Sequence, residues 1–120
     1  LRLYGSVGWT NYTGHAEMLE QAYANSLKTL AAYDGETLVG IIRAVGDGCS
    51  ILYVQDILVL PEYQRRGIGS ALTRRLLALY PDVYQKVLLT DDTEKTARFY
   101  RSLGFESAAE QGCAAFFRAW

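Results

Sequence analysis

Residues 64–71 read QRRGIGSA, and they follow an apolar run at 50–60 (SILYVQDILVL) that a proline at position 61 ends. Two arginines and two closely spaced glycines therefore stand where a strand turns into a helix. The start of a helix has backbone N–H groups without intrahelical partners, and glycines let an anion approach such groups closely. The stretch predicts a pyrophosphate-binding turn. The alternative is a turn that needs its glycines only for packing, with solvated arginines.

Two common phosphate-binding motifs are missing from the sequence. There is no G-x-x-x-x-G-K-[ST] loop, and no G-x-G-x-x-G occurs near a first βαβ unit. Their absence argues against an ATPase loop and against a nicotinamide-binding fold.

The elements around this turn follow from hydrophobic periodicity and turn residues. Asp34-Gly35 separates two apolar runs, as in a tight hairpin, and Thr93 and Gly104 are placed to begin and end a helix. The predicted helices are a short one within 1–12 and others at 16–24, 69–79 and 94–103, and the predicted strands are 27–33, 37–45, 50–60, 83–89, 106–109 and 113–120. This order predicts an α/β domain with a mixed sheet.

Composition limits the classes of function. The chain has 120 residues, of which 50% are hydrophobic and 21% charged, with a net charge of −1. This fits one domain without the basic face of a nucleic-acid partner, and no apolar stretch reaches the roughly 20 residues of a membrane span. The sequence predicts no metal site and two reduced, partly buried cysteines, and without a signal peptide we expect a cytoplasmic protein.

Two segments carry a resemblance to a known family. Residues 59–72 (VLPEYQRRGIGSAL) resemble motif A of the GNAT superfamily of acetyl-CoA-dependent N-acyltransferases, and residues 97–105 (ARFYRSLGF) resemble its second hallmark, A-x-x-[FL]-Y-x-x-x-G-F. The resemblance covers about residues 25–118. It implies a GNAT-like α/β fold, with a mixed, mostly antiparallel central sheet, a splayed strand pair and helices on both faces. It also implies one N-acetyltransferase domain over residues 1–120, whose usual first strand is missing.

The resemblance implies acetyl-CoA as cofactor. Its pyrophosphate would lie on backbone N–H groups of residues 65–70, and its pantetheine arm would pair with the backbone of Leu58 and Leu60. The N–H near Ile57 or Leu58 would stabilise the oxyanion of the reaction. The implied cofactor-binding residues are Leu58, Val59, Leu60, Gln64, Arg65, Arg66, Gly67, Ile68, Gly69, Ser70, Glu94 and Tyr100. Glu94 stands where the family often has an asparagine that binds pantetheine, so this contact departs from the pattern.

Tyr100 is the implied general acid. It falls where family members keep a tyrosine that protonates the departing thiolate, and a phenol of pKa about 10 suits a thiolate of similar basicity. The alternative is an aromatic ring packed at the end of a helix.

An amine acceptor must lose a proton before it attacks, which a carboxylate can accept. Asp56 on the central strand and Asp91 or Asp92 after the next strand are the candidates, with structural roles as the alternative. Trp9 and Tyr12 lie where the family builds the wall of the acceptor site, and packing within the core is the alternative for both.

The resulting hypothesis is direct acetyl transfer to an amine, with a small molecule as the expected acceptor. Acetylation of a protein N-terminus or lysine is one alternative, and a non-catalytic acyl-CoA-binding module is another. The resemblance also allows a homodimer through the closing strands.

Overall fold

The computed structural model describes residues 16–119, and the chain divides into two compact units, Leu1–Leu89 and Thr90–Trp120. The described elements of the first unit are α3 (Ala16–Ala24), β1 (Lys28–Asp34), β2 (Thr37–Gly46), β3 (Ile51–Val59), the 3₁₀ turn η1 (Pro61–Tyr63), α4 (Ile68–Leu79) and β4 (Gln85–Leu88). The second unit contains α5 (Glu94–Ser102) and the 3₁₀ turn η2 (Ala108–Gln111). The short helix predicted within residues 1–12 lies outside the described residues.

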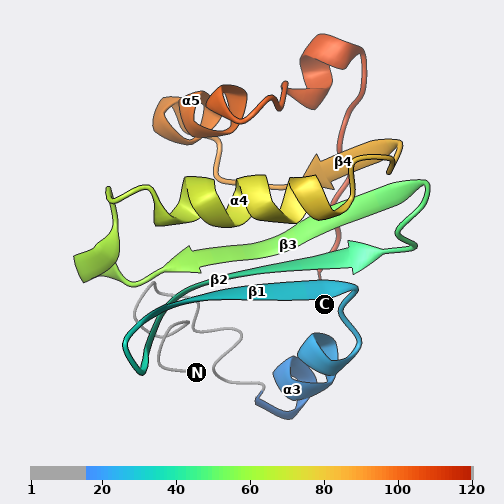
Figure 1. Ribbon diagram of the computed structural model, residues 1–120. Coiled ribbons are helices and arrows are strands. Elements are labelled where there is room, and N and C mark those ends of the chain that lie inside the picture. Colours follow the sequence, from blue (N-terminus) through green and yellow to red (C-terminus); the bar gives the residue numbers. More distant parts are fainter. Residues whose placement is uncertain (1–15, 120) are drawn as a thin grey trace. The chain divides into compact units, whose positions relative to one another are not determined.

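The first unit is built on a four-stranded sheet in the order β1-β2-β3-β4 (Figure 1). β1, β2 and β3 form an antiparallel meander, and β4 runs parallel to β3. The first hairpin turns through Gly35, whose φ of 61° is the left-handed conformation that a glycine adopts at little cost. The predicted mixed, mostly antiparallel sheet is confirmed.

A β-bulge interrupts the middle of β3. Arg43 of β2 lies opposite Asp56, but the next residue, Ala44, lies opposite Val54, so that Gln55 is the extra residue. The parallel pairing with β4 ends at the same point, with Val54 opposite Leu88. A bulge bends its strand and increases the local twist. The splayed strand pair therefore begins at the bulge.

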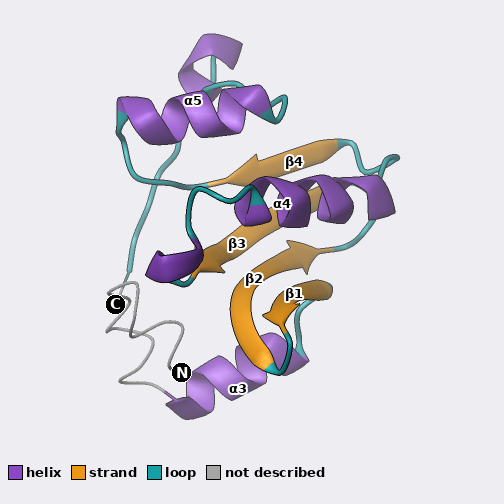
Figure 2. Cartoon of the chain, turned by 60° about the vertical axis from the view of Figure 1, so that its left-hand side comes forward, coloured by secondary structure: helices purple, strands orange, loops and turns teal. Residues whose placement is uncertain are grey.

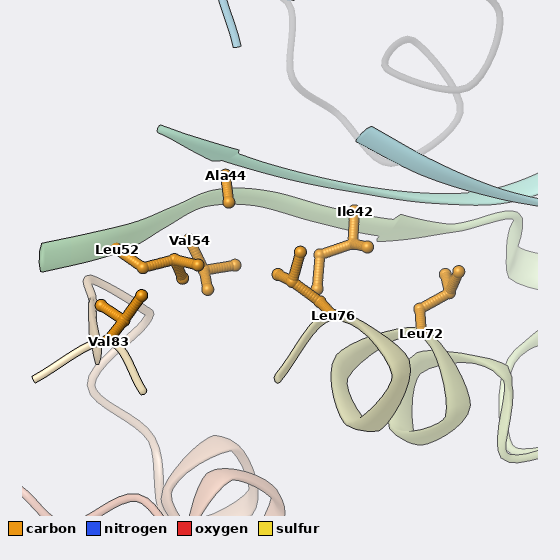
Figure 3. Close-up of a cluster of buried hydrophobic side chains, with 7 residues drawn as sticks. All are labelled: Ile42, Ala44, Leu52, Val54, Leu72, Leu76 and Val83. Atoms are coloured by element: carbon orange, nitrogen blue, oxygen red, sulfur yellow. The ribbon is translucent and has the colours of Figure 1, made fainter. Parts of the chain in front are cut away.

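Helices cover both faces of this sheet (Figures 1 and 2). One buried cluster joins β2 and β3 to α4 and to Val83 (Figure 3). The other joins β2, β3 and the residue after β3 to Leu19 of α3. Side chains of a regular strand alternate between faces. Leu52 and Val54 belong to the α4 cluster, whereas Leu58 belongs to the α3 cluster, because the bulge between them inverts the faces.

The second unit is organised around α5. The side chain of Thr93 accepts a hydrogen bond from the N–H of Thr96 at 3.2 Å, and Gly104 after the helix has a φ of 94°. Both helix-end predictions are confirmed.

The predicted closing strands at 106–109 and 113–120 are wrong for the residues that the structure describes. η2 occupies residues 108–111, and residues 113–119 have no regular secondary structure. Phe116 and Phe117 in this segment are 97% and 77% exposed. Apolar, β-prone residues suggest a strand, but a strand also needs a partner for its backbone hydrogen bonds.

Several expectations concern the described residues as a whole. Within residues 16–119 no helix has the length and apolar character needed to cross a membrane, and no three potential metal ligands cluster together. Cys49 and Cys113 are free thiols, and both are exposed, so the predicted partial burial of these side chains is wrong.

Candidate active site

The turn between β3 and α4 contains two residues in the left-handed conformation. Arg65 has a φ of 66° and Gly67, the N-cap of α4, has a φ of 79°. Turns that combine right- and left-handed residues can bring successive N–H groups to one concave side, where an anion can bind. The left-handed conformation costs a non-glycine residue of the order of 1–2 kcal/mol. Such strain is concentrated at functional sites.

Three side-chain contacts support this turn. The Gln64 side chain donates from Nε2 to the carbonyl of Val59 at 3.0 Å, which ties the end of the turn back to β3. The Tyr63 hydroxyl donates to Asp34 of the first hairpin at 2.6 Å, and the Arg66 guanidinium lies over the Tyr63 ring at 4.9 Å. The hydrogen bond to Asp34 raises the pKa of Tyr63 above its ordinary value. These contacts connect the arginine-glycine turn to β3 and to the first hairpin.

The start of α4 lies directly on the sheet because Gly40 leaves room for it. A Cβ at Gly40 would approach the side chains of Ile68 and Leu72 to 3.1 and 3.3 Å. The glycine of β2 therefore sets how closely the first turn of α4 approaches the strand. Ile68, Gly69 and Ser70 are partly buried there, while residues 64–67 are exposed.

The pairing of β3 with β4 ends at Val54. In the half of β3 that follows, alternate backbone N–H and C=O groups point to the edge that β4 no longer covers. The N–H of Leu60 donates to the carbonyl of Val39 at 2.8 Å, so it points into the sheet. Since successive residues of a strand direct their backbone groups to opposite sides, Leu58 also points to β2, and Ile57 and Val59 point to the other edge. Leu58 and Leu60, which the resemblance assigned to pantetheine, therefore direct their backbone groups to β2. Of the two residues expected near the oxyanion, Ile57 directs its N–H to the outer edge, and Leu58 does not.

Asp56 lies on the α3 side of the sheet and is buried with a cation. It is 1% exposed, and its Oδ2 accepts a hydrogen bond from Nε of Arg43, itself 5% exposed, at 2.9 Å. A carboxylate held by a guanidinium and shielded from solvent is poorly placed to accept a proton from an incoming amine. This environment favours the structural alternative for Asp56.

The second unit carries Tyr100, Asp91 and Glu94. The Tyr100 ring packs edge-on against Phe99 and Phe105, with ring centroids 4.9 and 6.0 Å away. Burial raises the pKa of Tyr100 above its ordinary value, as does the charge of Asp91, while a hydrogen bond with the Thr90 side chain acts in the opposite direction. A raised pKa keeps the phenol protonated, as a general acid requires. Asp91 and Glu94 are exposed.

The sequence motifs did not reveal the side-chain pairs that support the turn and the bulge. Tyr63 lies in the glycine-rich motif but its partner Asp34 is 29 positions away, and Arg43 and Asp56 are 13 positions apart. To predict either pair from the sequence, one must know the register of the strands. That register depends on the turn at Asp34-Gly35 and on the position of the bulge. Trp9 and Tyr12, the predicted acceptor wall, lie outside the described residues.

Comparisons with known proteins agree with this arrangement. Residues 25–107 match the family model described as an acetyltransferase (GNAT) domain. A solved GNAT-family acetyltransferase from Streptococcus pneumoniae TIGR4 is 49% identical, with a TM-score of 0.91 over 99% of this chain and 86% of that one. A probable acetyltransferase from methicillin-resistant Staphylococcus aureus is 26% identical, with a TM-score of 0.76 over 87% of this chain and 79% of that one.

Curated relatives include longer proteins. A histone acetyltransferase of Glycine max is 37% identical over 61% of this chain and 32% of its own length. A chloroplastic GCN5-related N-acetyltransferase of Arabidopsis thaliana is 37% identical over 61% of this chain and 28% of its own length. The chain thus spans about a third of the length of each of these two relatives. With the family model matched over most of its length and a solved relative at 49% identity, the chain belongs to the GNAT acetyltransferase family.

Proposed function

We propose that this chain is an N-acetyltransferase that moves the acetyl group of acetyl-CoA directly to an amine, most simply that of a small molecule. The observation that carries the proposal is the turn with left-handed residues at Arg65 and Gly67. This turn follows the half of β3 that extends beyond the pairing with β4. A pyrophosphate fits a concave set of N–H groups at a helix start, and an extended pantetheine arm fits an open strand edge.

The proposed reaction assigns one task to each part. The turn at residues 65–70 binds the pyrophosphate, with Gln64 and the start of α4 holding its shape. The edge-facing backbone of Ile57 and Val59 binds the arm, and the Ile57 N–H stabilises the oxyanion as the amine nitrogen attacks the thioester carbon. The carbon–sulfur bond then breaks, and Tyr100 gives its proton to the leaving thiolate.

The acceptor ammonium group must lose one proton before its nitrogen can attack, and that nitrogen loses a second proton as the amide forms. Of the three predicted carboxylates, Asp91 and Asp92 are exposed, whereas Asp56 is buried against Arg43. Exposure favours Asp91 or Asp92, directly or through water, over Asp56. The family match at 25–107 crosses from the first compact unit into the second, which supports one acetyltransferase domain made of both.

The acceptor has a second candidate class. One curated relative is named as a histone acetyltransferase, which favours a lysine side chain as the alternative to a small amine. A cytoplasmic location and a homodimer stay predictions from the sequence; one relative of Arabidopsis thaliana is named as chloroplastic.

Calorimetric titration of the protein with acetyl-CoA, coenzyme A, adenosine 3′,5′-bisphosphate and ATP tests the proposal. We expect micromolar binding of both coenzymes, weaker binding of the bisphosphate, which lacks pyrophosphate and pantetheine, and none of ATP. No binding of either coenzyme would overturn the proposal.

Thiol release in the presence of acetyl-CoA then separates the classes of function. Release with a panel of small di- and polyamines supports the small-molecule acceptor, and release only with a lysine-containing peptide supports the protein acceptor. Tight binding of acetyl-CoA with no release for either panel supports the non-catalytic module.

A further inference from the structure

The buried Arg43–Asp56 pair lies at the place where β3 changes its pairing. It is the first residue pair between β2 and β3 on the site side of the bulge, and the extra residue Gln55 precedes Asp56 directly. On the other side of the bulge, Val54 is the last residue of β3 that pairs with β4. The pair therefore lies beside the point at which the edge of β3 opens.

The same pair connects three elements. Nε of Arg43 donates to Asp56 at 2.9 Å, and Nη1 donates to the hydroxyl of Ser26 at 3.3 Å and to the carbonyl of Ala22 at 3.4 Å. The guanidinium also lies 5.1 Å from the ring centroid of Tyr23 in α3. A planar guanidinium with several fixed donors orients its partners more narrowly than an ammonium group can. β2, β3 and the end of α3 are thus held to one cation.

A bulge has a cost that its surroundings must offset. The extra residue disrupts the ladder locally, and an unbulged register would move Asp56 to the other face of the sheet, where the α4 cluster is apolar. A buried carboxylate without its cation is strongly unfavourable there. The ion pair therefore stabilises the bulged register against the regular one.

From this arrangement we infer that Arg43 and Asp56 are positioning residues, which hold the bulge so that the backbone of Ile57 and Val59 faces the acetyl-CoA edge of β3. The inference rests on the proposed function. It assigns Asp56 no proton transfer, and its effect on catalysis passes through the Ile57 N–H that follows it. Arg43, which the sequence motifs do not mark, becomes as important for catalysis as Asp56.

The test is infrared spectroscopy of acetyl-CoA labelled with ¹³C at the thioester carbonyl, bound to the wild-type protein and to variants. A hydrogen bond from Ile57 shifts the carbonyl stretch of the bound thioester to lower wavenumber. We expect Arg43→Met and Asp56→Leu to lose most of this shift, although neither side chain is placed against the thioester. Their affinity for acetyl-CoA should fall roughly tenfold, as one or two backbone hydrogen bonds are misplaced.

Two further variants separate positioning from general destabilisation. Leu52→Ala removes a fully buried side chain on the other side of the bulge and should weaken the fold while leaving the carbonyl shift unchanged. Arg43→Lys keeps the charge but loses the planar fork, and it should recover only part of the shift.

Each outcome decides the inference or the function separately. If the wild-type protein does not bind acetyl-CoA, the proposed function fails, and this inference fails with it. If the wild-type protein binds and shows the shift, but Arg43→Met and Asp56→Leu show the same shift while folded, the pair does not position the oxyanion donor. If Leu52→Ala loses the shift as well, the loss reflects destabilisation, and the inference is wrong.

Discussion

The two halves of β3 make different use of one continuous strand. Residues 51–54 pair with β2 on one side and β4 on the other, and Leu52 and Val54 pack under α4. Residues 56–59 keep the pairing with β2 after the bulge but extend beyond the pairing with β4. Asp56 and Leu58 face α3 instead, with Asp56 held by Arg43. The first half is paired on both edges, and the second has an outer edge beyond β4, where we propose that acetyl-CoA binds.

The comparison suggests an experiment that separates the residues needed for stability from those needed for acetyl transfer. A single inserted residue inverts the faces while the strand continues in the same sheet, and it lies where the pairing with β4 ends. The first half is expected to affect the free energy of unfolding, and the second half is expected to affect binding and turnover. The predictions below are ordered by the expected size of the effect.

Gly67→Asp should have the largest effect on the binding of acetyl-CoA. The change places a carboxylate at the N-cap of α4, where the pyrophosphate is proposed to bind, and like charges in contact cost several kcal/mol. Acetyl-CoA affinity measured by calorimetry should fall by roughly a thousandfold or more.

The matched control is Gly112→Asp. Gly112 has a φ of 74°, close to the 79° of Gly67, and at both positions an added Cβ would meet no atom within 4 Å. The two substitutions thus impose the same backbone strain and the same charge. Equal affinity of the two variants would mean that the turn before α4 does not bind the pyrophosphate.

Leu52→Ala should lower the stability of the fold and leave the binding of acetyl-CoA unchanged. Leu52 is fully buried, and removal of such a side chain costs about 2–5 kcal/mol of unfolding free energy, depending on how far the cavity collapses. Urea unfolding should show this loss, while the affinity of the folded variant for acetyl-CoA stays at the wild-type value. A matching loss of affinity would mean that the two halves of β3 are not separable.

Much of this scaffold follows from the sequence, because its signals are local. Asp34-Gly35 places the first hairpin, Thr93 caps α5 through its own side chain, and Gly104 follows the helix with positive φ. The glycine-rich turn is equally local, since its residues act through their own backbone.

The bulge and the ion pair are not local. The stretch from Ile51 to Leu60 is apolar except at Gln55 and Asp56, and this polar pair alone does not show that one of its residues is inserted. Asp56 reads as a site carboxylate until strand register brings Arg43 opposite. The closing strands failed for a related reason, because the pattern at 113–119 contains no information about a pairing partner.

Tyr100→Phe should test whether acetyl transfer needs the phenol of Tyr100, which belongs to the second compact unit. Loss of the phenol should lower kcat by roughly ten- to a thousandfold with little change in acetyl-CoA affinity. Tyr84→Phe is the control, because Tyr84 is exposed and has no proposed role. Unchanged turnover in Tyr100→Phe would remove this residue from the mechanism.

The pH dependence sharpens this prediction. Burial raises the pKa of Tyr100, so the folded protein retains this proton to a higher pH than the unfolded chain does. The acid is therefore protonated throughout the neutral range, and kcat should show no loss on the alkaline side from this group below about pH 10. A wild-type alkaline limb near neutral pH that Tyr100→Phe removes would contradict the raised pKa.

Arg65→Gly should give the smallest effect and the most specific reading of the turn. The φ of 66° costs arginine of the order of 1–2 kcal/mol, whereas glycine adopts it freely but loses about 0.5–1 kcal/mol to the greater entropy of its unfolded chain. The two terms nearly cancel, so thermal unfolding should show a change within about 1 kcal/mol, on the stabilising side. Arg66→Gly is the matched control: Arg66 lies outside the left-handed region and contacts the Tyr63 ring, so the same substitution there should only destabilise. If both variants lose the same stability, Arg65 is not strained, and the turn owes its shape to its glycines alone.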